Sequence, residues 1–112
     1  MKQREVILTN FPFSDISEIK ARPTIVLSND DYNDSHKDIL VCAVTSNPRE
    51  YEYSVRIGKN DMETGTLLQS SRIKADKIML MSKTQTIKTM GKISESKFRE
   101  TKEKILALIS GK

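Results

Sequence analysis

The chain lacks several features that would set it apart from an ordinary globular domain. It has one cysteine, Cys42, so no intrachain disulfide can form, and it has no tryptophan. No apolar run approaches the ~20 residues that a membrane-spanning helix needs, and residues 1–5 lead into no signal-peptide core. These absences predict a cytoplasmic protein without a membrane partner, in which Cys42 is a small buried side chain.

Glycine and proline are also scarce, with four and three residues, and the sequence contains no low-complexity linker and no internal repeat. Hydrophobic residues make up 37% of the chain and charged residues 30%, which is typical of a globular protein. We therefore expect one domain over residues 1–112.

Histidine occurs once, as His36, in a segment that also contains Asp30, Asp31, Asp34 and Asp38. A metal site is one interpretation, but the segment lacks the glycine and the closing glutamate of a calcium-binding loop. We expect His36 to be a solvated turn residue, and we predict neither a metal nor another cofactor.

Short apolar runs separated by polar turns indicate a mainly β protein. Such runs occur at residues 6–8, 24–27, 39–44, 51–57, 66–68 and 78–81. The continuous runs are typical of central strands, whereas the alternating residues 51–57 indicate a strand with one solvated face. We expect residues 22–28 and 39–45 to form neighbouring central strands.

A helix is predicted near the C-terminus, over residues 95–109. Ser94 is a suitable N-cap, Glu95 complements the positive end of the helix dipole, and Ser110-Gly111 supplies a stop. The apolar residues of the helix are expected to cover the sheet, and they are Phe98, Ile105, Leu106, Leu108 and Ile109. Several short strands with one late helix predict a mainly β (α+β) fold, built as a small, strongly curved barrel.

The charges are distributed unevenly along the chain. Residues 1–71 hold 8 basic and 11 acidic side chains, a balance of −3, whereas residues 72–112 hold 11 basic and 4 acidic side chains, a balance of +7. A basic half favours a polyanionic partner through counterion release, although several of these charges belong to the predicted helix.

Arg22 opens one predicted central strand, and Thr45-Ser46 closes the next. If the two strands pair, an arginine and two hydroxyls meet at strand ends, where a scaffold commonly presents functional groups. The arginine fork matches phosphate and a hydroxyl can position a phosphate oxygen, which suits phosphodiester chemistry without a metal. The alternative is a strand-capping arginine beside an ordinary turn threonine.

Five collinear segments carry a family resemblance. They are residues 11–15 (FPFSD), 20–28 (KARPTIVLS), 41–46 (VCAVTS), 65–68 (GTLL) and 76–78 (DKI). In this order and spacing the chain, over about residues 4–109, resembles the PemK/MazF family, the toxins of type II toxin–antitoxin modules. The resemblance implies an SH3-like barrel with a C-terminal helix. It also implies a metal-independent endoribonuclease that cuts single-stranded RNA, including mRNA, at short motifs and is neutralised by a cognate antitoxin.

The family's catalytic arginine and threonine correspond to Arg22 and Thr45. The resemblance implies attack by the adjacent 2′-hydroxyl, which leaves a 2′,3′-cyclic phosphate and a 5′-hydroxyl. Further RNA-binding residues are expected near this pair or in segments that contact RNA in relatives: Pro12, Ser14, Lys20, Ser46, Gln69, Ser70, Ser71 and Lys74. Turn and loop roles are the alternative for the residues near Arg22 and Thr45.

Two observations leave alternatives open. Some family members carry an arginine and an aspartate near the positions of Leu67 and Gln69, and both are absent here. A non-catalytic toxin or SH3-like binding module of the same fold is therefore the second hypothesis, although the tryptophan-bearing tail of gyrase poisons is absent. Tyr51 and Tyr53 share one face of the predicted alternating strand, where they could stack on bases, but packing is the favoured interpretation.

The resemblance also implies partners. A two-fold homodimer is expected, together with an antitoxin that docks an acidic, disordered segment across the dimer and blocks the RNA groove. Operator DNA would be bound only through the antitoxin complex.

Overall fold

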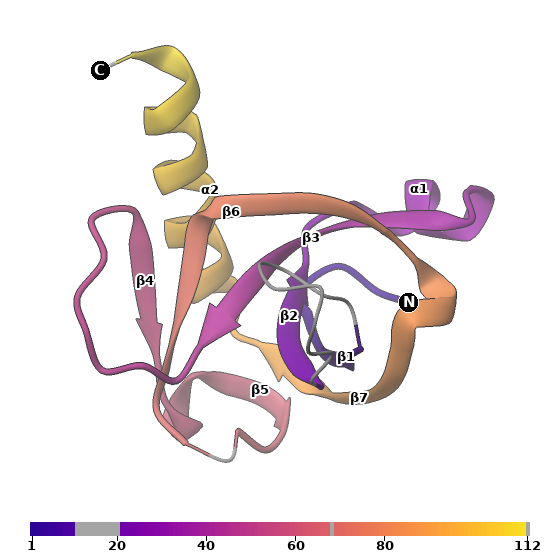
Figure 1. Cartoon of the computed structure of the whole chain (residues 1–112), viewed down its shortest axis with the longest axis horizontal. Helices are drawn as coiled ribbons and strands as arrows, with labels where there is room; N and C mark the ends of the chain where they lie inside the picture. The colour runs from indigo at the N-terminus through magenta and orange to yellow at the C-terminus, as the bar shows by residue number, and fades with distance from the viewer. Residues whose placement is uncertain (11–20, 68, 112) are drawn as a thin grey trace.

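The computed structural model describes residues 1–10, 21–67 and 69–111, and one antiparallel sheet dominates these ranges (Figure 1). Its seven strands lie in the order β4-β6-β3-β2-β1-β7-β5. The elements are β1 (Glu5–Thr9), β2 (Arg22–Val26), α1 (Asp30–Ser35), β3 (Asp38–Thr45), β4 (Ser54–Ile57), β5 (Met62–Gly65), β6 (Ser71–Ser82), β7 (Thr86–Ile93) and α2 (Glu95–Ser110), with 3₁₀ turns at Lys59–Asp61 and Lys83–Gln85. The sheet curls into a half-barrel, so the prediction of a mainly β fold with a late helix is confirmed.

The central strands β1, β2 and β3 are apolar on both faces because the curled sheet buries both. Neighbouring residues of β2 enter different clusters: Ile25 belongs to the first core and Val26 to the second. The first core contains Val6, Ile25, Cys42, Val44, Val55, Ile57, Leu67, Ile73, Ile93 and Phe98, and the second contains Ile7, Val26, Ile39, Val41 and Met81. Cys42 is buried as predicted, and burial raises the pKa of its thiol to about 12.

The predicted pairing of residues 22–28 with 39–45 is confirmed in its essentials, since β2 and β3 are hydrogen-bonded neighbours near the middle of the sheet. The strand predicted over residues 51–57 begins only at Ser54. Residues 66 and 67 lie outside any strand, and β5 precedes them and pairs with β7. Leu68 lies outside the described residues.

Strand β6 is longer than predicted, since the prediction covered only residues 78–81. Its first part pairs with β4 and most of its length pairs with β3, with a register shift between Cys42 and Val44. Residues 71–77 read as polar in sequence, yet Ile73 and Ala75 point into the protein while Arg72 and Lys74 are only partly covered. This alternation carries basic side chains to the end of β3.

Helix α2 has the predicted start and N-cap, and it ends at Ser110, one residue beyond the predicted range. The Ser94 hydroxyl accepts a hydrogen bond from the Lys97 amide at 3.3 Å, and Gly111 adopts the left-handed conformation with φ 72°. Phe98 is buried, but Leu106, Leu108 and Ile109 are exposed, so the prediction that they cover the sheet is wrong. The reason is visible in Figure 1, where the C-terminal half of α2 projects beyond the sheet. No helix in the described ranges is long and apolar enough to span a membrane.

The segment predicted as a turn around His36 contains the short helix α1, capped by Asn29. His36 is exposed at its C-terminal end, and its ring stacks on Tyr32 with 3.9 Å between centroids. The Gln3 amide donates to Asp30 Oδ1 at 2.8 Å and holds the pKa of this carboxyl below its usual range. Across the described residues, no three His, Cys, Asp or Glu side chains are arranged to hold a metal ion.

Candidate functional site

The strand register brings Arg22 and Thr45 together. Thr24 pairs with Ala43 across β2 and β3, so the same register carried two residues further sets Arg22 opposite Thr45. Thr45 in turn pairs with Arg72 of β6, and Arg72 pairs with Arg56 of β4. Three arginines and one threonine therefore form a row across four adjacent strands, on one face of the sheet.

Arg22 is held at the start of β2 by its neighbour in β1. Thr9 is fully buried and pairs with Arg22, and its hydroxyl donates to the Arg22 carbonyl oxygen at 3.0 Å. The Arg22 side chain itself is exposed. The backbone is thus fixed while the guanidinium is presented at the surface, which is the arrangement expected of a functional arginine.

The Thr45 hydroxyl is oriented by the turn that follows β3. Its oxygen accepts a hydrogen bond from the Asn47 amide at 3.2 Å, and Asn47 Oδ1 accepts one from the Arg49 amide at 3.0 Å. The hydroxyl proton of Thr45 is thereby left to donate outward. A hydroxyl in this state suits donation to a phosphate oxygen better than removal of a proton.

Arg22 and Thr45 both line a cavity of about 280 Å³, which we call the central cavity. Its other polar side chains are those of Ser46, Gln69 and Ser71. The apolar part of its wall is formed by Leu8, Pro23, Val44, Leu67 and Met90. Sequence analysis predicted all five polar residues, and the fold collects them from β2, the end of β3 and the start of β6. Ser71 is buried and its hydroxyl donates to the Gln69 carbonyl at 3.0 Å, so it shapes the wall.

The same pair lines a second cavity of about 200 Å³, the tyrosine cavity. Tyr51, Lys74 and Lys77 complete its polar lining. Lys74 was predicted, whereas Tyr51 was assigned to packing and Lys77 was not singled out. Tyr51 and Tyr53 precede β4, so the prediction that they share one strand face is wrong.

A third cavity of about 110 Å³, the arginine cavity, adjoins the central one through shared Ser46 and Ser71. It contains the predicted Ser70 together with Arg56 and Arg72, which sequence analysis missed. Arg72 donates to Ser54 Oγ at 3.1 Å and pairs with Glu50 at 3.3 Å, so it is anchored, whereas Arg56 is exposed.

The electrostatic character of the three cavities is uniform. They are lined by five cationic side chains and, among the described residues, by no acidic one; the cations are Arg22, Arg56, Arg72, Lys74 and Lys77. Three of these five, Arg72, Lys74 and Lys77, belong to the +7 half of the sequence, whose charge was the sequence signal that could have found Arg72 and Lys77. The predicted Pro12, Ser14 and Lys20 lie outside the described residues.

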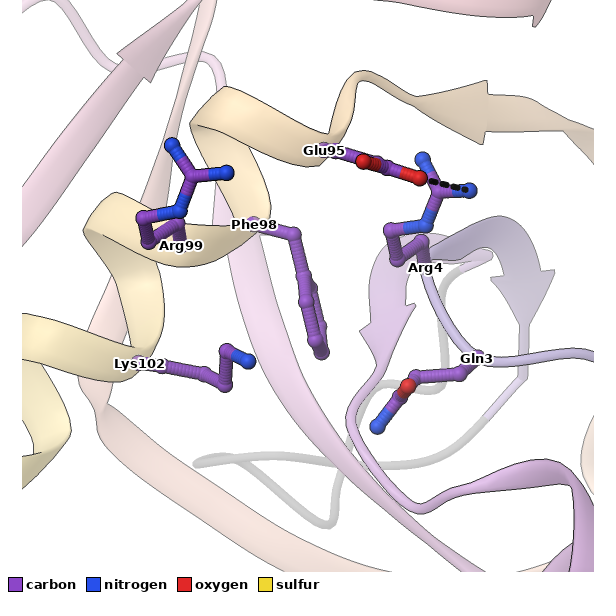
Figure 2. Close-up of a pocket in the computed structure, with 6 residues that line it drawn as sticks. All are labelled: Gln3, Arg4, Glu95, Phe98, Arg99 and Lys102. Carbon is purple, nitrogen blue, oxygen red and sulfur yellow. Dashed lines mark ion pairs between the residues drawn. The ribbon is translucent and has the colours of Figure 1, made fainter.

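A fourth cavity, of about 210 Å³, lies between the N-terminal segment and α2 (Figure 2). Phe98 points into it between Lys102 and the Gln3–Arg4 segment. Its Arg4 donates to Glu63 Oε1 at 3.0 Å and to the Ile93 carbonyl at 2.9 Å, and lies 3.9 Å from Glu95. This guanidinium is paired with two carboxylates and connects the start of β1 to the β7–α2 junction, so we interpret Arg4 as a structural residue.

Comparison with known proteins identifies the protein family. Residues 2–109 match the family model described as a PemK-like, MazF-like toxin of type II toxin–antitoxin systems. The chain belongs to the PemK/MazF toxin family. A comparison with curated protein sequences gave no significant match.

Solved structures of this family share the fold. MazF from Deinococcus radiodurans is 20% identical with a TM-score of 0.78, covering 98% of this chain and 96% of its own. An endoribonuclease in complex with its cognate antitoxin, from a mycobacterial species, is 20% identical with a TM-score of 0.75, covering 99% and 95%. The Mycobacterium tuberculosis toxin MazF-mt6 is 18% identical with a TM-score of 0.77, covering 96% and 97%.

Proposed function

We propose that this PemK/MazF family member is an endoribonuclease that cuts single-stranded RNA at short motifs without a metal. The observation that carries the proposal is that Arg22 and Thr45 line one cavity, beside four further cations and no described acidic side chain. The positive electrostatic potential of these cavities favours a polyanion as the ligand. The endoribonuclease and antitoxin named among its structural relatives support the same class.

We assign the cut to an internal transfer of the phosphoryl bond. The ribose 2′-hydroxyl attacks the adjacent phosphorus and loses its proton to solvent water, while the bond to the 5′-oxygen breaks and that oxygen takes a proton from water. The products therefore carry a 2′,3′-cyclic phosphate and a 5′-hydroxyl. The Arg22 guanidinium stays protonated throughout, so its part is to stabilise the charge that develops on the nonbridging oxygens. The Thr45 hydroxyl donates to one of these oxygens and fixes the phosphate in the cavity.

A cleavage assay in the presence of a chelator tests this function. Purified protein is incubated with a mixed RNA substrate in excess EDTA, with Arg22→Ala as the control. We expect defined fragments from the wild-type protein and none from Arg22→Ala. Loss of activity on chelation would mean that a metal-activated water makes the cut, and RNA binding without cleavage would favour a non-catalytic toxin or binding module.

We propose further that the toxin is a homodimer. The exposed side chains of Leu40, Ile78 and Leu80 lie on the paired strands β3 and β6, where Leu40 faces Leu80. An apolar group of this kind on a small protein suits a partner surface. Sedimentation should give twice the chain mass of 12.8 kDa. A 12.8 kDa species at tens of micromolar would contradict the dimer.

The proposed antitoxin is a small protein with an acidic segment, because the cavities and the +7 half offer a complementary basic surface. It is expected to cover the RNA groove, and operator DNA would be contacted only through the complex. Co-expression with the product of the neighbouring reading frame should restore growth, and the two proteins should co-purify. A neighbour that does neither would exclude it as the partner. Because the proposed substrate is cellular RNA, we expect the activity in the cytoplasm.

A further inference from the structure

Tyr51 has a position that packing does not explain. It lies in the segment between β3 and β4, is half-buried, and belongs to neither hydrophobic core. Its side chain instead lines the tyrosine cavity with Arg22, Thr45 and Lys74. An aromatic ring therefore adjoins the two residues to which the phosphate chemistry is assigned.

The ring and its backbone are held in place. Lys74 Nζ lies 4.4 Å from the ring centroid, and the Tyr51 carbonyl accepts a hydrogen bond from Ser54 Oγ at 2.6 Å. Ser54 in turn accepts from Arg72. These contacts tie the loop to β4 and β6, so the ring is preorganised for binding.

The second cation at the ring is more weakly placed. Arg49 Cζ lies 5.4 Å from the centroid, and Arg49 is exposed, whereas Lys74 is half-buried. A flat ligand can take the place of the exposed guanidinium over the ring while Lys74 remains. The released Arg49 is then available to a neighbouring phosphate.

We infer that Tyr51 is the stacking platform for the nucleobase beside the phosphate held by Arg22 and Thr45. This inference rests on the proposed function and adds a nucleobase site to it. Stacking accepts every base because each has a π-face, and it favours the bases that stack most strongly. Tyr51 should therefore give a preference for purines at one position next to the cut, with no absolute requirement.

Three variants separate this role from alternatives. Tyr51→Phe keeps the ring and loses the hydroxyl, Tyr51→Leu keeps apolar bulk and loses the ring, and Tyr53→Ala removes the neighbouring half-buried tyrosine, which lines none of the three cavities of the site. Circular dichroism and thermal unfolding establish that each variant is folded. The cut sites in a random RNA pool are mapped in EDTA, and the cleavage rate is measured on one preferred oligonucleotide.

We expect Tyr51→Leu to lower kcat/KM about 10- to 100-fold, the range for losing one base–aromatic stack, and to flatten the preference at a single position. Tyr51→Phe and Tyr53→Ala should keep the wild-type profile. An unchanged rate and profile in Tyr51→Leu would overturn the inference while leaving the endoribonuclease proposal intact. An equal loss of kcat/KM and of base preference in Tyr53→Ala would also overturn it, because the effect would then come from disturbing the loop and not from losing the Tyr51 ring.

A separate binding experiment distinguishes failure of this inference from failure of the proposed function. The protein has no tryptophan, so its tyrosine emission can be followed while a single-stranded deoxyoligonucleotide, which lacks the attacking 2′-hydroxyl, is titrated. Quenching that is present in the wild type and lost in Tyr51→Leu supports the platform even if no RNA is cut. Absence of quenching in the wild type would overturn the platform.

Discussion

Arg4 and Arg22 lie at opposite ends of the β1–β2 pair, and each lines a cavity, but their surroundings differ. The Arg4 guanidinium meets Glu63, Glu95 and the Ile93 carbonyl, and its side chain is only 16% exposed. Arg22 is exposed, and no described acidic residue lines either of its cavities. An arginine whose donors are already used holds the fold together, whereas one presented beside a hydroxyl and further cations can receive a phosphate.

The backbone strengthens this contrast. Arg4 has φ 77°, a left-handed conformation that costs a non-glycine residue about 1–2 kcal/mol. The Arg4 amide donates to the Val26 carbonyl at 2.9 Å and its carbonyl accepts from the Ile93 amide at 3.0 Å, so the strain is offset by contacts with β2 and β7. Strain at Arg4 therefore reflects its structural role in joining three elements.

The largest effect is expected at Arg22. Arg22→Ala should lower kcat/KM by at least about 100- to 1000-fold, the loss seen on removing one transition-state donor, with little change in the unfolding free energy because the side chain is exposed. Arg22→Lys should recover part of the rate, since it keeps the charge and loses the fork. His36→Ala, at the end of α1, serves as a control that should stay near the wild-type rate. An Arg22→Ala rate within threefold of wild type would remove Arg22 from the mechanism.

A smaller loss is expected at Thr45. Thr45→Ala should lower kcat/KM about 10- to 100-fold, because a hydrogen bond to a charged group contributes about 1.5–3 kcal/mol. Thr45→Ser should retain much of the activity because it keeps the hydroxyl that Asn47 orients. Single-turnover rates on one oligonucleotide would measure both. A serine variant as weak as the alanine variant would show that the threonine methyl, and not the hydroxyl, is what matters.

Arg4 should show the opposite pattern. Arg4→Ala should lower the unfolding free energy by about 1.5–3 kcal/mol while the folded fraction cleaves at the wild-type rate. Arg4→Gly loses the same contacts but relieves the left-handed backbone, so it should be more stable than Arg4→Ala by about 1 kcal/mol. Urea unfolding of the three proteins measures both differences. A stable Arg4→Ala variant with impaired cleavage would instead connect this cavity to function.

The smallest effect concerns Cys42 and pH. Because burial raises its pKa to about 12, the folded protein keeps the thiol protonated at pH values where the unfolded chain ionises it. The contribution of this group to the free energy of unfolding is therefore constant below about pH 8.5. It decreases as the pH rises from there toward 12. A thiol reagent at pH 8 should label Cys42 only in denaturant. Rapid labelling of the native protein would show that the first core opens.

The role of Arg22 could be predicted from the sequence, whereas the role of Arg4 could not. The central strands were visible because β2 and β3 are apolar on both faces, and Arg22 and Thr45 stood out because they mark strand ends. The function of Arg4 was invisible, since its partners Glu63, Ile93 and Glu95 are 59 residues or more away in sequence. Such long-range pairs are set by the fold.

The same limit explains the residues missed at the site. Arg56 and Arg72 join it because β4 pairs with the polar first part of β6, a pairing that no local pattern in residues 71–77 indicates. Tyr51 lies inside the strand predicted over residues 51–57 but precedes the observed β4, which begins at Ser54, so its face was misjudged. The helix was located by its caps, but the exposure of Leu106 and Ile109 depends on where the sheet ends beneath it.

The central claim is that Arg22 and Thr45 act on a phosphate attacked by the substrate's own 2′-hydroxyl. The most direct measurement uses a preferred RNA oligonucleotide carrying a single 2′-deoxy nucleotide on the 5′ side of the cut, incubated in EDTA beside its all-ribose parent. We expect the deoxy substrate to remain intact, and the parent to yield a 2′,3′-cyclic phosphate and a 5′-hydroxyl. Cleavage of the deoxy substrate, or products with 5′-phosphates, would show that water makes the attack and would contradict this account.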